Sequence, residues 1–494
     1  MSGTGGAQTR RGLVILVVMV VVTLTALVGS SILLTGDVAV AAAVNDGRVE
    51  QSRLAAWSGV QAVMSRLHAQ RDDLLEGASP VIPESWTFPL EQGWAPAFRV
   101  SGSDGLTLAQ SENAKIDVNL ATVEMLAAAP TLDEDLARKI VAARPFGSIA
   151  ELTRVDGITP EMVYGIDGYI DEQPGPGVGE ADRADELSGG AGALRDVLTV
   201  FSFDPNVQLG LGEGGEGRLG DRRINLAMAW SDRVREAVVD RWDEDVAAFL
   251  ERLFEQGETL RSTSDVVALM RRLGAPAESW VGALDAVTTT DGEHVRGLVD
   301  LNRASATVLA MIPGIDEGAA RAIVEARERI GIDERRSIVW PVIEGALSEE
   351  AFTQACDWLT TRSTQWRVRV TGGVRNTQAA DGSREARLRD RVTYECVIDV
   401  SSRRPRVAYL REVTALAYAL SLREPDPPTA IEPDIGLDGS QDEPWTDDPA
   451  RPEDGDWTPD RSPEQTREPA GSGDARARPA GRIGRWRVGA GGDA

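Results

Sequence analysis

An uncharged stretch near the N-terminus constrains this chain more than any other feature. Within "RRGLVILVVMVVVTLTALVGSSILLTGD", the 22 residues from Leu13 to Leu34 carry no charge. As a helix rising about 1.5 Å per residue they would be about 33 Å long, which matches the hydrocarbon core of a bilayer. Arg10 and Arg11 precede the stretch and favour a cytoplasmic N-terminus. We therefore expect one membrane-spanning helix, with the remainder of the chain outside the cytoplasm.

Two simpler interpretations of this stretch stay open. One is a cleaved secretory signal, because Ala39-Val40-Ala41 offers the small residues typical of a cleavage site. Its apolar segment would, however, exceed the roughly 7–15 residues usual in such signals. The other is a plain membrane anchor without processing.

The composition excludes several functional classes. A chain of 494 residues is too long for one core, so we expect two or three folded parts with tails. Its 78 acidic and 52 basic residues give a net charge of −26, which opposes binding to nucleic-acid phosphates. The two cysteines and two histidines do not have the spacing of a zinc site. Neither lysine lies in a phosphate-binding loop of the ATPase type, and no catalytic motif stands out.

Downstream of the apolar stretch the pattern stays helical and then becomes extended. No proline occurs before Pro80, and the helix is expected to carry an apolar stripe of Leu54, Trp57, Val60, Ala62, Met64 and Leu67. Residues 83–112 indicate short strands around Trp86 and Phe88, Phe98 and Val100, and Leu106 and Leu108.

The C-terminal part predicts a second group of strands. "WRVRVTGG", "VTYECVIDV" and "RVAYLRE" alternate apolar and polar residues, which indicates three antiparallel strands with one buried face. Cys396 lies on that face and is expected in the core, although an oxidising compartment would also allow a disulfide with Cys356. Beyond about residue 424 the composition predicts a disordered acidic and proline-rich tail.

An internal repeat lies between these two groups of strands. Residues 117–144, "DVNLATVEMLAAAPTLDEDLARKIVAAR", align without a gap on residues 300–327, "DLNRASATVLAMIPGIDEGAARAIVEAR". The match predicts two related units, each of two short helices joined by a tight turn. Asn119 or Thr122, and Asn302 or Ser305, are the candidate caps of the first helix. A fragment at residues 222–230, "RRINLAMAW", repeats the opening alone.

The turns of the two units decide whether they grip DNA or serve as packing units. A DNA-binding hairpin needs glycines that let backbone N–H groups reach a phosphate, with positive charge nearby. The predicted turns are Pro130-Thr131-Leu132, without glycine, and Pro313-Gly314-Ile315. Each is followed by two carboxylates, Asp-Glu in both copies. We therefore expect a structural use and no nucleic-acid binding.

The N-terminus also resembles the type IV prepilin signal. A short leader ends in Arg-Arg-Gly12, and the apolar run starts at once with Leu13. In that family a dedicated prepilin peptidase cuts after the glycine. Members usually carry glutamate at the fifth mature position, which here is Val17. One minor pseudopilin class is similar in lacking that glutamate.

The order of the motifs extends this resemblance over roughly residues 10–411. An anchor, a first helix, strands, helix-hairpin-helix units, then "WLTTRSTQWRVRV" and a terminal strand pair resemble the K-type minor pseudopilin of the bacterial type II secretion system. The resemblance implies an α+β fold, in which the transmembrane helix continues into a pilin-like α/β head with antiparallel strands. That head would carry a large inserted helical domain of sterile-alpha-motif-like shape.

The resemblance also implies a function. It indicates a non-enzymatic, single-pass inner-membrane protein with its bulk in the periplasm. This protein would assemble with other minor pseudopilins and the major pseudopilin, at the tip of a pseudopilus that helps export folded proteins. Calcium is known in some members and the acidic surface permits it, but no loop here has the spacing to name ligands, and no other cofactor is expected. A rival interpretation is a membrane-anchored periplasmic DNA receptor of the competence type, which also carries helix-hairpin-helix units.

These inferences divide the chain into eight expected regions. They are the leader (1–12), transmembrane helix (13–36), long helix and first strands (37–112), first helix-hairpin-helix unit (113–171), linker (172–193), second helical region with the repeat (194–362), C-terminal strands (363–423) and tail (424–494).

Overall fold

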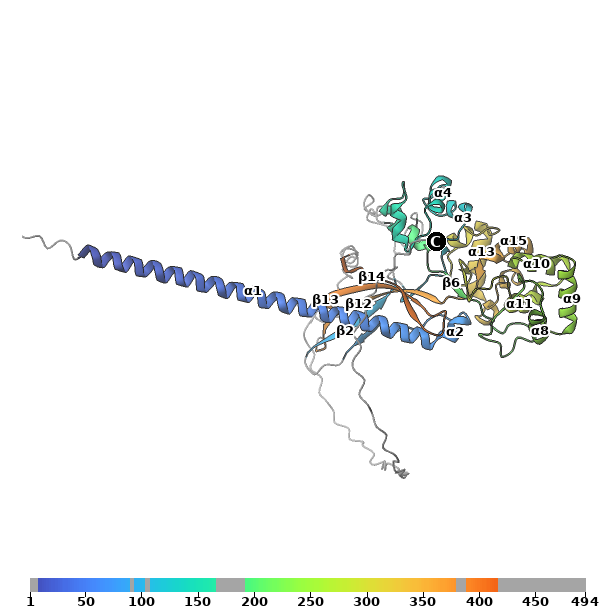
Figure 1. The fold of residues 1–494 in the computed structure, drawn as a ribbon, viewed down its shortest axis with the longest axis horizontal. Helices are drawn as coiled ribbons and strands as arrows, with labels where there is room; N and C mark the ends of the chain where they lie inside the picture. The colour runs from blue at the N-terminus through green and yellow to red at the C-terminus, as the bar shows by residue number, and fades with distance from the viewer. Residues whose placement is uncertain (1–7, 89–92, 103–106, 166–191, 379–387, 416–494) are drawn as a thin grey trace, which may run out of the picture. The chain divides into compact units, whose positions relative to one another are not determined.

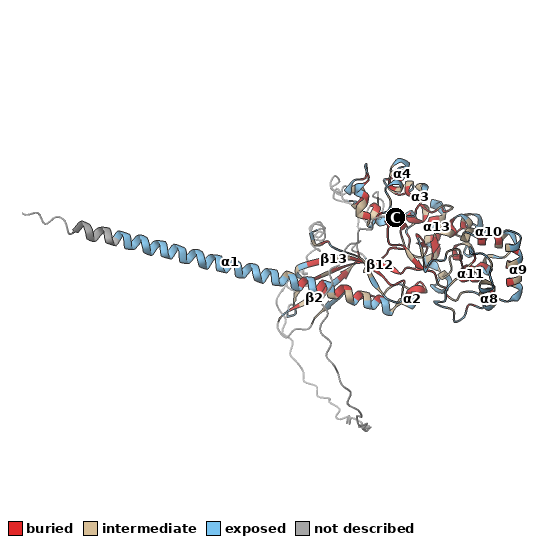
Figure 2. Ribbon diagram, viewed as in Figure 1, coloured by how far each residue is buried: buried red, intermediate tan, exposed pale blue. Residues whose placement is uncertain are grey.

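The first helix is the longest element of the fold. The computed structural model describes residues 8–88, 93–102, 107–165, 192–378 and 388–415. In it α1 runs from Gln8 to Ala69, 62 residues without a break (Figure 1). Its described side chains are exposed from Leu16 to Arg48 (Figure 2). Among the described residues α1 is the one helix long and apolar enough to cross a membrane, judged by length and composition.

The second half of α1 lies on an antiparallel sheet. The strands follow the order β1 (Ser85–Thr87), β2 (Trp94–Ser101), β12 (Gln365–Asn376), β13 (Arg389–Asp399) and β14 (Arg406–Glu412), and the short β3 (Gln110–Ser111) also pairs with β12. The helix contacts β2, β12 and β13. Strands from both ends of the chain therefore form one sheet under one helix, which confirms the predicted α+β fold class.

Two glycines allow α1 to approach the sheet closely. A Cβ added at Gly59 would lie 2.5 Å from Cγ1 of Val370. A Cβ added at Gly372 of β12 would lie 2.2 Å from the backbone nitrogen of Ala56 and 2.3 Å from the carbonyl oxygen of Ser52. Because these distances are far below van der Waals contact, helix and strand can pack this closely only where the side chain is a hydrogen atom.

The buried face of α1 differs from the predicted apolar stripe. Val60 and Leu67 are buried as expected, together with Val63. Leu54 and Trp57 are instead 59% and 41% exposed. The face that meets the sheet is centred on the small residues described above, because large side chains do not fit where the two backbones come close. For Leu54 and Trp57, and for Ala62, which is also exposed, the prediction was therefore wrong.

The predicted strands are largely confirmed. The three C-terminal segments form β12, β13 and β14, and Phe98 and Val100 lie in β2. No strand forms at Leu108, which lies in a bend, while Leu106 falls outside the described residues; the next strand is β3. Cys356 and Cys396 are both buried free thiols, so no disulfide joins them.

Between β3 and β12 the described residues form three helical units, and each is closed by a parallel pair of two-residue strands. In the first, β4 (Ile116–Asp117) pairs with β5 (Leu198–Thr199). In the second, β7 (Ile224–Asn225) pairs with β8 (Val287–Thr288). In the third, β10 (Val299–Asp300) pairs with β11 (Leu359–Thr360). An Asp or Asn is thus opposite a Thr in every pair.

The middle unit is the main difference from the sequence-based prediction. The fragment at residues 222–230 was expected to repeat the opening alone, but its strand β7 has a closing partner, and helices lie between them. Strand β5 likewise extends the first unit to Thr199, beyond the linker expected at 172–193. Most of that linker, and the whole of the expected tail, lie outside the described residues.

The helices of the three units have the following bounds. The first unit contains α3 (Val123–Ala127), α4 (Glu134–Ala142), η1 (Ile149–Arg154), α5 (Pro160–Tyr164) and α7 (Leu194–Val197). The second contains α8 (Asp232–Arg241), α9 (Glu244–Glu255), α10 (Thr263–Arg272) and α11 (Ala277–Ala286). The third contains α12 (Ala306–Ala310), α13 (Glu317–Arg329), η3 (Asp333–Arg335), α14 (Trp340–Ile343), α15 (Glu349–Ala355) and η4 (Cys356–Trp358). Outside the units, α2 (Arg71–Leu75) follows α1, and β6 (Phe203–Pro205) pairs antiparallel with β9 (His294–Arg296).

The contact between helix and sheet predicts that replacing glycine by alanine affects stability differently at two positions of α1. Gly59→Ala should lower the free energy of unfolding by about 1–3 kcal/mol, because the new methyl group overpacks the interface. Gly47→Ala should cause no loss, because no atom lies within 4 Å of the added Cβ and alanine favours the helix. Urea unfolding of the full-length protein in detergent, followed by tryptophan fluorescence, measures both. Equal effects of the two substitutions would contradict the close packing.

Candidate functional site in the helix-hairpin-helix units

Each outer unit begins with a helix capped by a hydroxyl side chain. Oγ1 of Thr122 accepts a hydrogen bond from the backbone N–H of Met125 at 3.2 Å. Oγ of Ser305 accepts one from the N–H of Val308 at 3.3 Å. These bonds satisfy N–H groups that have no partner inside the helix. Of the two candidate caps in each copy, the hydroxyl residue is the one that caps α3 or α12.

The asparagines that were the other candidate caps, Asn119 and Asn302, instead connect each unit to later parts of the chain. The side chain of Asn119 exchanges two hydrogen bonds with the backbone of Phe146, at 2.9 and 2.8 Å. The amide of Asn302 donates to the carbonyl oxygens of Arg335 and Thr361, at 3.0 and 2.9 Å. Both asparagines therefore hold the segment that follows the helix pair.

The predicted turn residues lie between the two helices of each pair. Thr131 and Gly314 occupy the same place in the repeat and have positive φ angles of 65° and 85°. The residues that follow them, Leu132 and Ile315, are buried in the helical core. The two turns therefore share one backbone geometry, although only the second has the glycine that this geometry favours.

In both hairpins an aspartate occupies the place where a phosphate would bind. The N-terminus of the second helix offers free backbone N–H groups, which attract anions. Here Oδ1 of Asp133 accepts from the N–H of Leu136 at 2.8 Å, and Oδ1 of Asp316 accepts from the N–H of Ala319 at 2.8 Å. Each carboxylate engages one of these N–H groups and repels a further anion.

The third unit's turn is also covered by another helix. A Cβ added at Gly314 would lie 2.5 Å from the carbonyl oxygen of Ala351 and 2.9 Å from Cβ of Gln354, both in α15. Glycine is therefore needed here for close packing within the protein. A nucleic-acid backbone could not approach the turn from this side without displacing α15.

The arginine that ends each repeat is committed to an internal contact. Arg144 donates to the carbonyl oxygen of Ala121 at 2.6 Å, and Arg327 donates to that of Ala304 at 2.6 Å. Burial lowers the pKa of both guanidinium groups from the usual arginine value. Each arginine binds the segment that leads into the first helix of its own pair, which is a structural task.

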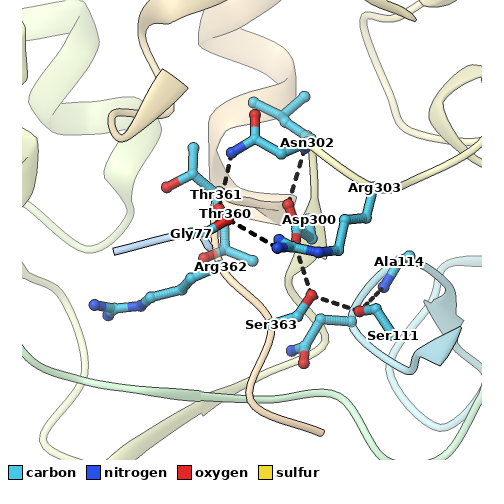
Figure 3. Close-up of polar contacts among 12 residues, drawn as sticks. Gly77, Ser111, Ala114, Asp300, Asn302, Arg303, Thr360, Thr361, Arg362 and Ser363 are labelled. Atoms are coloured by element: carbon cyan, nitrogen blue, oxygen red, sulfur yellow. Dashed lines mark hydrogen bonds and ion pairs between the residues drawn. The ribbon is translucent and has the colours of Figure 1, made fainter. Parts of the chain in front are cut away.

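A buried aspartate joins the third unit to the rest of the protein. Oδ1 of Asp300 accepts from the N–H of Asn302 at 2.9 Å, and its Oδ2 accepts from Arg303 at 2.8 Å and from Ser363 at 2.5 Å (Figure 3). Arg303 also donates to both carbonyl oxygens of Gly77–Ala78, at 2.8 Å each. One carboxylate and one guanidinium thus hold three segments together. These are the segment after α2, the start of the third unit and the chain entering β12.

The network continues to the point where the chain leaves the sheet. Ser363 lies 2.5 Å from Ser111 of β3, oxygen to oxygen (Figure 3). Next to it, the buried Glu112 accepts from Nε of Arg367 at 2.6 Å. Burial alone would raise the pKa of Glu112, but the charges of Arg367 and Lys115 hold that pKa at about 2. The polar residues therefore fix both crossings between sheet and helical units.

The first copy lacks the arginine partner of this junction. Asp117 corresponds to Asp300 and accepts from the N–H of Asn119 at 2.8 Å, but Leu120 stands where the third unit has Arg303. Without an ion pair of that kind, burial raises the pKa of Asp117 to about 6. The two copies thus differ at the position that supplies the ion-pair partner of the buried aspartate in the third unit.

The predicted processing residues lie near the N-terminal end of the described residues, away in sequence from the hairpin turns. Gly12 and Leu13 have helical backbone within α1. Val17 is 52% exposed on the same helix. The structure does not bring them together with the hairpin turns. Among the described residues, no group of three His, Cys, Asp or Glu side chains could hold a metal ion, so calcium ligands stay unassigned.

Comparisons with known proteins support the helix-hairpin-helix motif more firmly than they support a relationship over the whole chain. The helix-hairpin-helix motif family matches residues 111–171 and 295–338, in the first and third units. No curated protein matches the chain. One similar solved structure is that of the GspK-GspI-GspJ complex from the type 2 secretion system of enterotoxigenic Escherichia coli. The matching chain is 12% identical, with 74% of this chain and 99% of that chain covered and a TM-score of 0.25.

The occupied hairpins predict that the full-length protein in detergent does not bind duplex DNA at physiological salt. A fluorescence anisotropy titration with a labelled duplex should show no saturation at micromolar protein. The variant Asp316→Ser keeps a capping side chain and removes one charge, and it should also fail to bind, because α15 covers the third unit's turn. Micromolar binding that weakens steeply with added salt, as counterion release requires, would contradict this use of the hairpins.

The two equivalent aspartates predict opposite responses to amide substitution. The folded pKa of Asp117, about 6, lies above the ordinary value of 3.8, so its contribution to stability is present below pH 3.8 and lost as the pH rises through 6. Asp117→Asn should therefore raise the free energy of unfolding by about 1–3 kcal/mol at pH 8 and change it little at pH 4.

Asp300→Asn is the matched substitution in the third unit. It leaves the largely buried Arg303 without its carboxylate and should lower the free energy of unfolding by about 3–5 kcal/mol. Denaturant melts of both variants at pH 4, 6 and 8 test the pair. A stabilising Asp300→Asn, or a pH-independent effect of Asp117→Asn, would show that the junction is not built as described.

Proposed function

We propose that this chain is a non-enzymatic, single-pass inner-membrane subunit of the minor pseudopilin kind, placed at the tip of a type II secretion pseudopilus. The observation that carries the proposal is the division of α1. Its first half presents exposed apolar side chains over more than twenty residues, and its second half is docked on an antiparallel sheet through Gly59 and Gly372. Such a helix suits a protein that starts in a membrane and then contributes the same helix to a bundle of neighbours.

The exposed half of α1 needs apolar surroundings both in a membrane and in a bundle of neighbouring subunits. Leu16, Leu24, Leu27 and Leu34 are each more than 60% exposed. A continuous apolar surface of this length is not stable in water and requires lipid or neighbouring helices. A prepilin peptidase cutting after Gly12 would leave this half as the mature N-terminus, with the bulk of the chain in the periplasm.

Val17 supports the tip position within that proposal. In a pilin-like fibre, the glutamate at the fifth mature position neutralises the amino group of the subunit added before it. An unpaired charge in the apolar bundle would be costly. A subunit with no earlier neighbour meets no such amino group, so an apolar side chain fits there. The three helical units add bulk beside the head, which would crowd neighbours within a shaft and not at its end.

The rival proposal, a DNA receptor of the competence type, has less support. It needs hairpins with accessible N–H groups and unpaired positive charge. The aspartate caps, the cover by α15 and the internal use of Arg144 and Arg327 all count against it.

Processing is the first test of the proposal. N-terminal sequencing of the membrane-bound protein should start at Leu13, and Gly12→Leu should abolish cleavage. Gly29→Leu serves as the control in the same helix, because nothing lies within 4 Å of its added Cβ. A start near Ala42 would favour a secretory signal, and a start at Met1 would favour a plain anchor; either result would overturn the proposal.

A second test concerns the fifth mature position. Val17→Glu should still insert, at a cost of about 3 kcal/mol for an acidic residue in mid-membrane. It should not improve incorporation into fibres, because no amino group awaits it. Val18→Glu is the matched control with the same cost at a neighbouring position. Better incorporation of the Val17 variant than of the Val18 variant would contradict the tip position.

A further inference from the structure

A cavity of about 310 Å³ lies between the second and third helical units. Its walls come from the N-terminal end of α10, from the β7–β8 pair with its flanking residues, and from the segment of η4 and β11 that leads back to the sheet. None of the hairpin turns lines it. Its volume is typical of a site for a small ligand.

Positive charge is concentrated in this cavity, although the chain as a whole is strongly acidic. Four arginines line it, Arg223, Arg261, Arg336 and Arg362, against the two carboxylates of Asp285 and Asp357. An excess of arginine at one point of a chain with net charge −26 requires an explanation.

Both carboxylates are already saturated by the protein. The two oxygens of Asp285 accept from the backbone N–H groups of Leu209 and Leu211, at 2.7 and 2.9 Å. Those of Asp357 accept from the N–H and hydroxyl of Ser264, at 3.1 and 2.6 Å. These carboxylates therefore organise the walls, and within the described residues neither forms an ion pair with an arginine of the cavity.

Arg362 presents a fixed and unpartnered donor. Its side chain is only 2% exposed, and its Nε and Nη2 are held by Asp204 at 3.0 and 2.8 Å. Its Nη1 has no hydrogen-bond partner in the described part of the chain. A buried donor without a partner is costly, and native proteins rarely leave one unmet.

Two further arginines of the cavity have donors to spare. Within the part of the chain that the structure describes, Arg223 donates through Nε alone, to the carbonyl oxygen of Asp285 at 3.0 Å. Arg336 pairs through Nη2 with Glu76 at 3.3 Å, but its Nε is buried without a partner among the described residues. Burial is the largest cause that lowers the pKa of Arg223 from the usual arginine value, and the neighbouring charge of Arg362 adds to it, while the carboxylates of Asp204 and Asp285 act in the opposite direction. An anion between the two arginines would favour the charged form of Arg223. A single water needs only about 10–15 Å³, so water at Nη1 would leave most of the cavity unused.

We propose that this cavity binds a small oxyanion, a carboxylate or phosphate group, between Arg223 and Arg362, with the exposed Arg261 and the threonines of β8 and β11 around it. The planar donor forks of arginine match the oxygen pairs of both groups. The site is independent of the proposed place of the chain in a pseudopilus, since it needs neither a membrane nor a neighbour. Its occupant would join the second and third units across the cavity.

Equilibrium dialysis of the full-length protein in detergent tests the proposal. The probes are radiolabelled inorganic phosphate and, separately, radiolabelled citrate, at constant ionic strength set with sodium chloride. We expect one saturable site per chain for at least one probe, and the probe that displaces the other identifies phosphate or carboxylate chemistry as preferred. Arg223→Gln and Arg261→Gln should each weaken binding at least tenfold. Arg404→Gln, an exposed arginine in the turn between β13 and β14, should not change it.

The variants keep the test decisive. Arg261 is exposed and makes no side-chain hydrogen bond within the described residues, so its substitution leaves the fold intact even if Arg223→Gln does not fold. Circular dichroism identifies a variant that is unfolded. The proposal would be overturned if neither phosphate nor citrate showed saturable binding. It would also be overturned if Arg261→Gln left the affinity of the saturable site unchanged.

Discussion

The backbone of α1 lies against the backbone of β12 because glycine stands on both sides of the contact. Gly59 meets Val370, and Gly372 meets the helix at Ser52 and Ala56. This contact sets where on the helix the sheet begins and therefore how much of the apolar half is left for a membrane or a neighbour. It also positions β12, to which β3 is paired, so the two chain crossings into the helical units are fixed with it.

The helix-hairpin-helix units illustrate how one backbone geometry serves a different purpose when its polar atoms are already satisfied. A hairpin that grips DNA leaves N–H groups open at the start of its second helix. Here Asp133 and Asp316 occupy those groups, and the terminal arginines bind backbone carbonyls inside the protein. What remains is a packing module, closed in each unit by a short parallel strand pair. The third unit gains an attachment that the first lacks, because Arg303 meets the buried Asp300 where the first unit has a leucine.

Much of this architecture could be predicted from the sequence, for reasons that are local. Length and lack of charge identify the apolar half of α1, period-two alternation identifies β12, β13 and β14, and proline followed by Asp-Glu marks the hairpin turns. The buried face of α1 was partly mispredicted, because its position depends on the distance to the sheet, which no helical periodicity contains. The middle unit was missed because it shares only its opening strand with the others. The junction at Asp300 and the arginine-lined cavity were not predicted, since their side chains come from segments far apart in the sequence, such as Gly77, Ser111 and Ser363.

The location of the subunit in an isolated fibre tests the proposed tip position. Both native cysteines are buried, and burial raises the pKa of their thiols, so a maleimide label would react selectively at Arg404→Cys in an exposed turn. Electron microscopy of fibres carrying an electron-dense label at this position would then show where the chain resides. For a subunit at the tip we expect label at one end of each fibre. Label distributed along the shaft would contradict it.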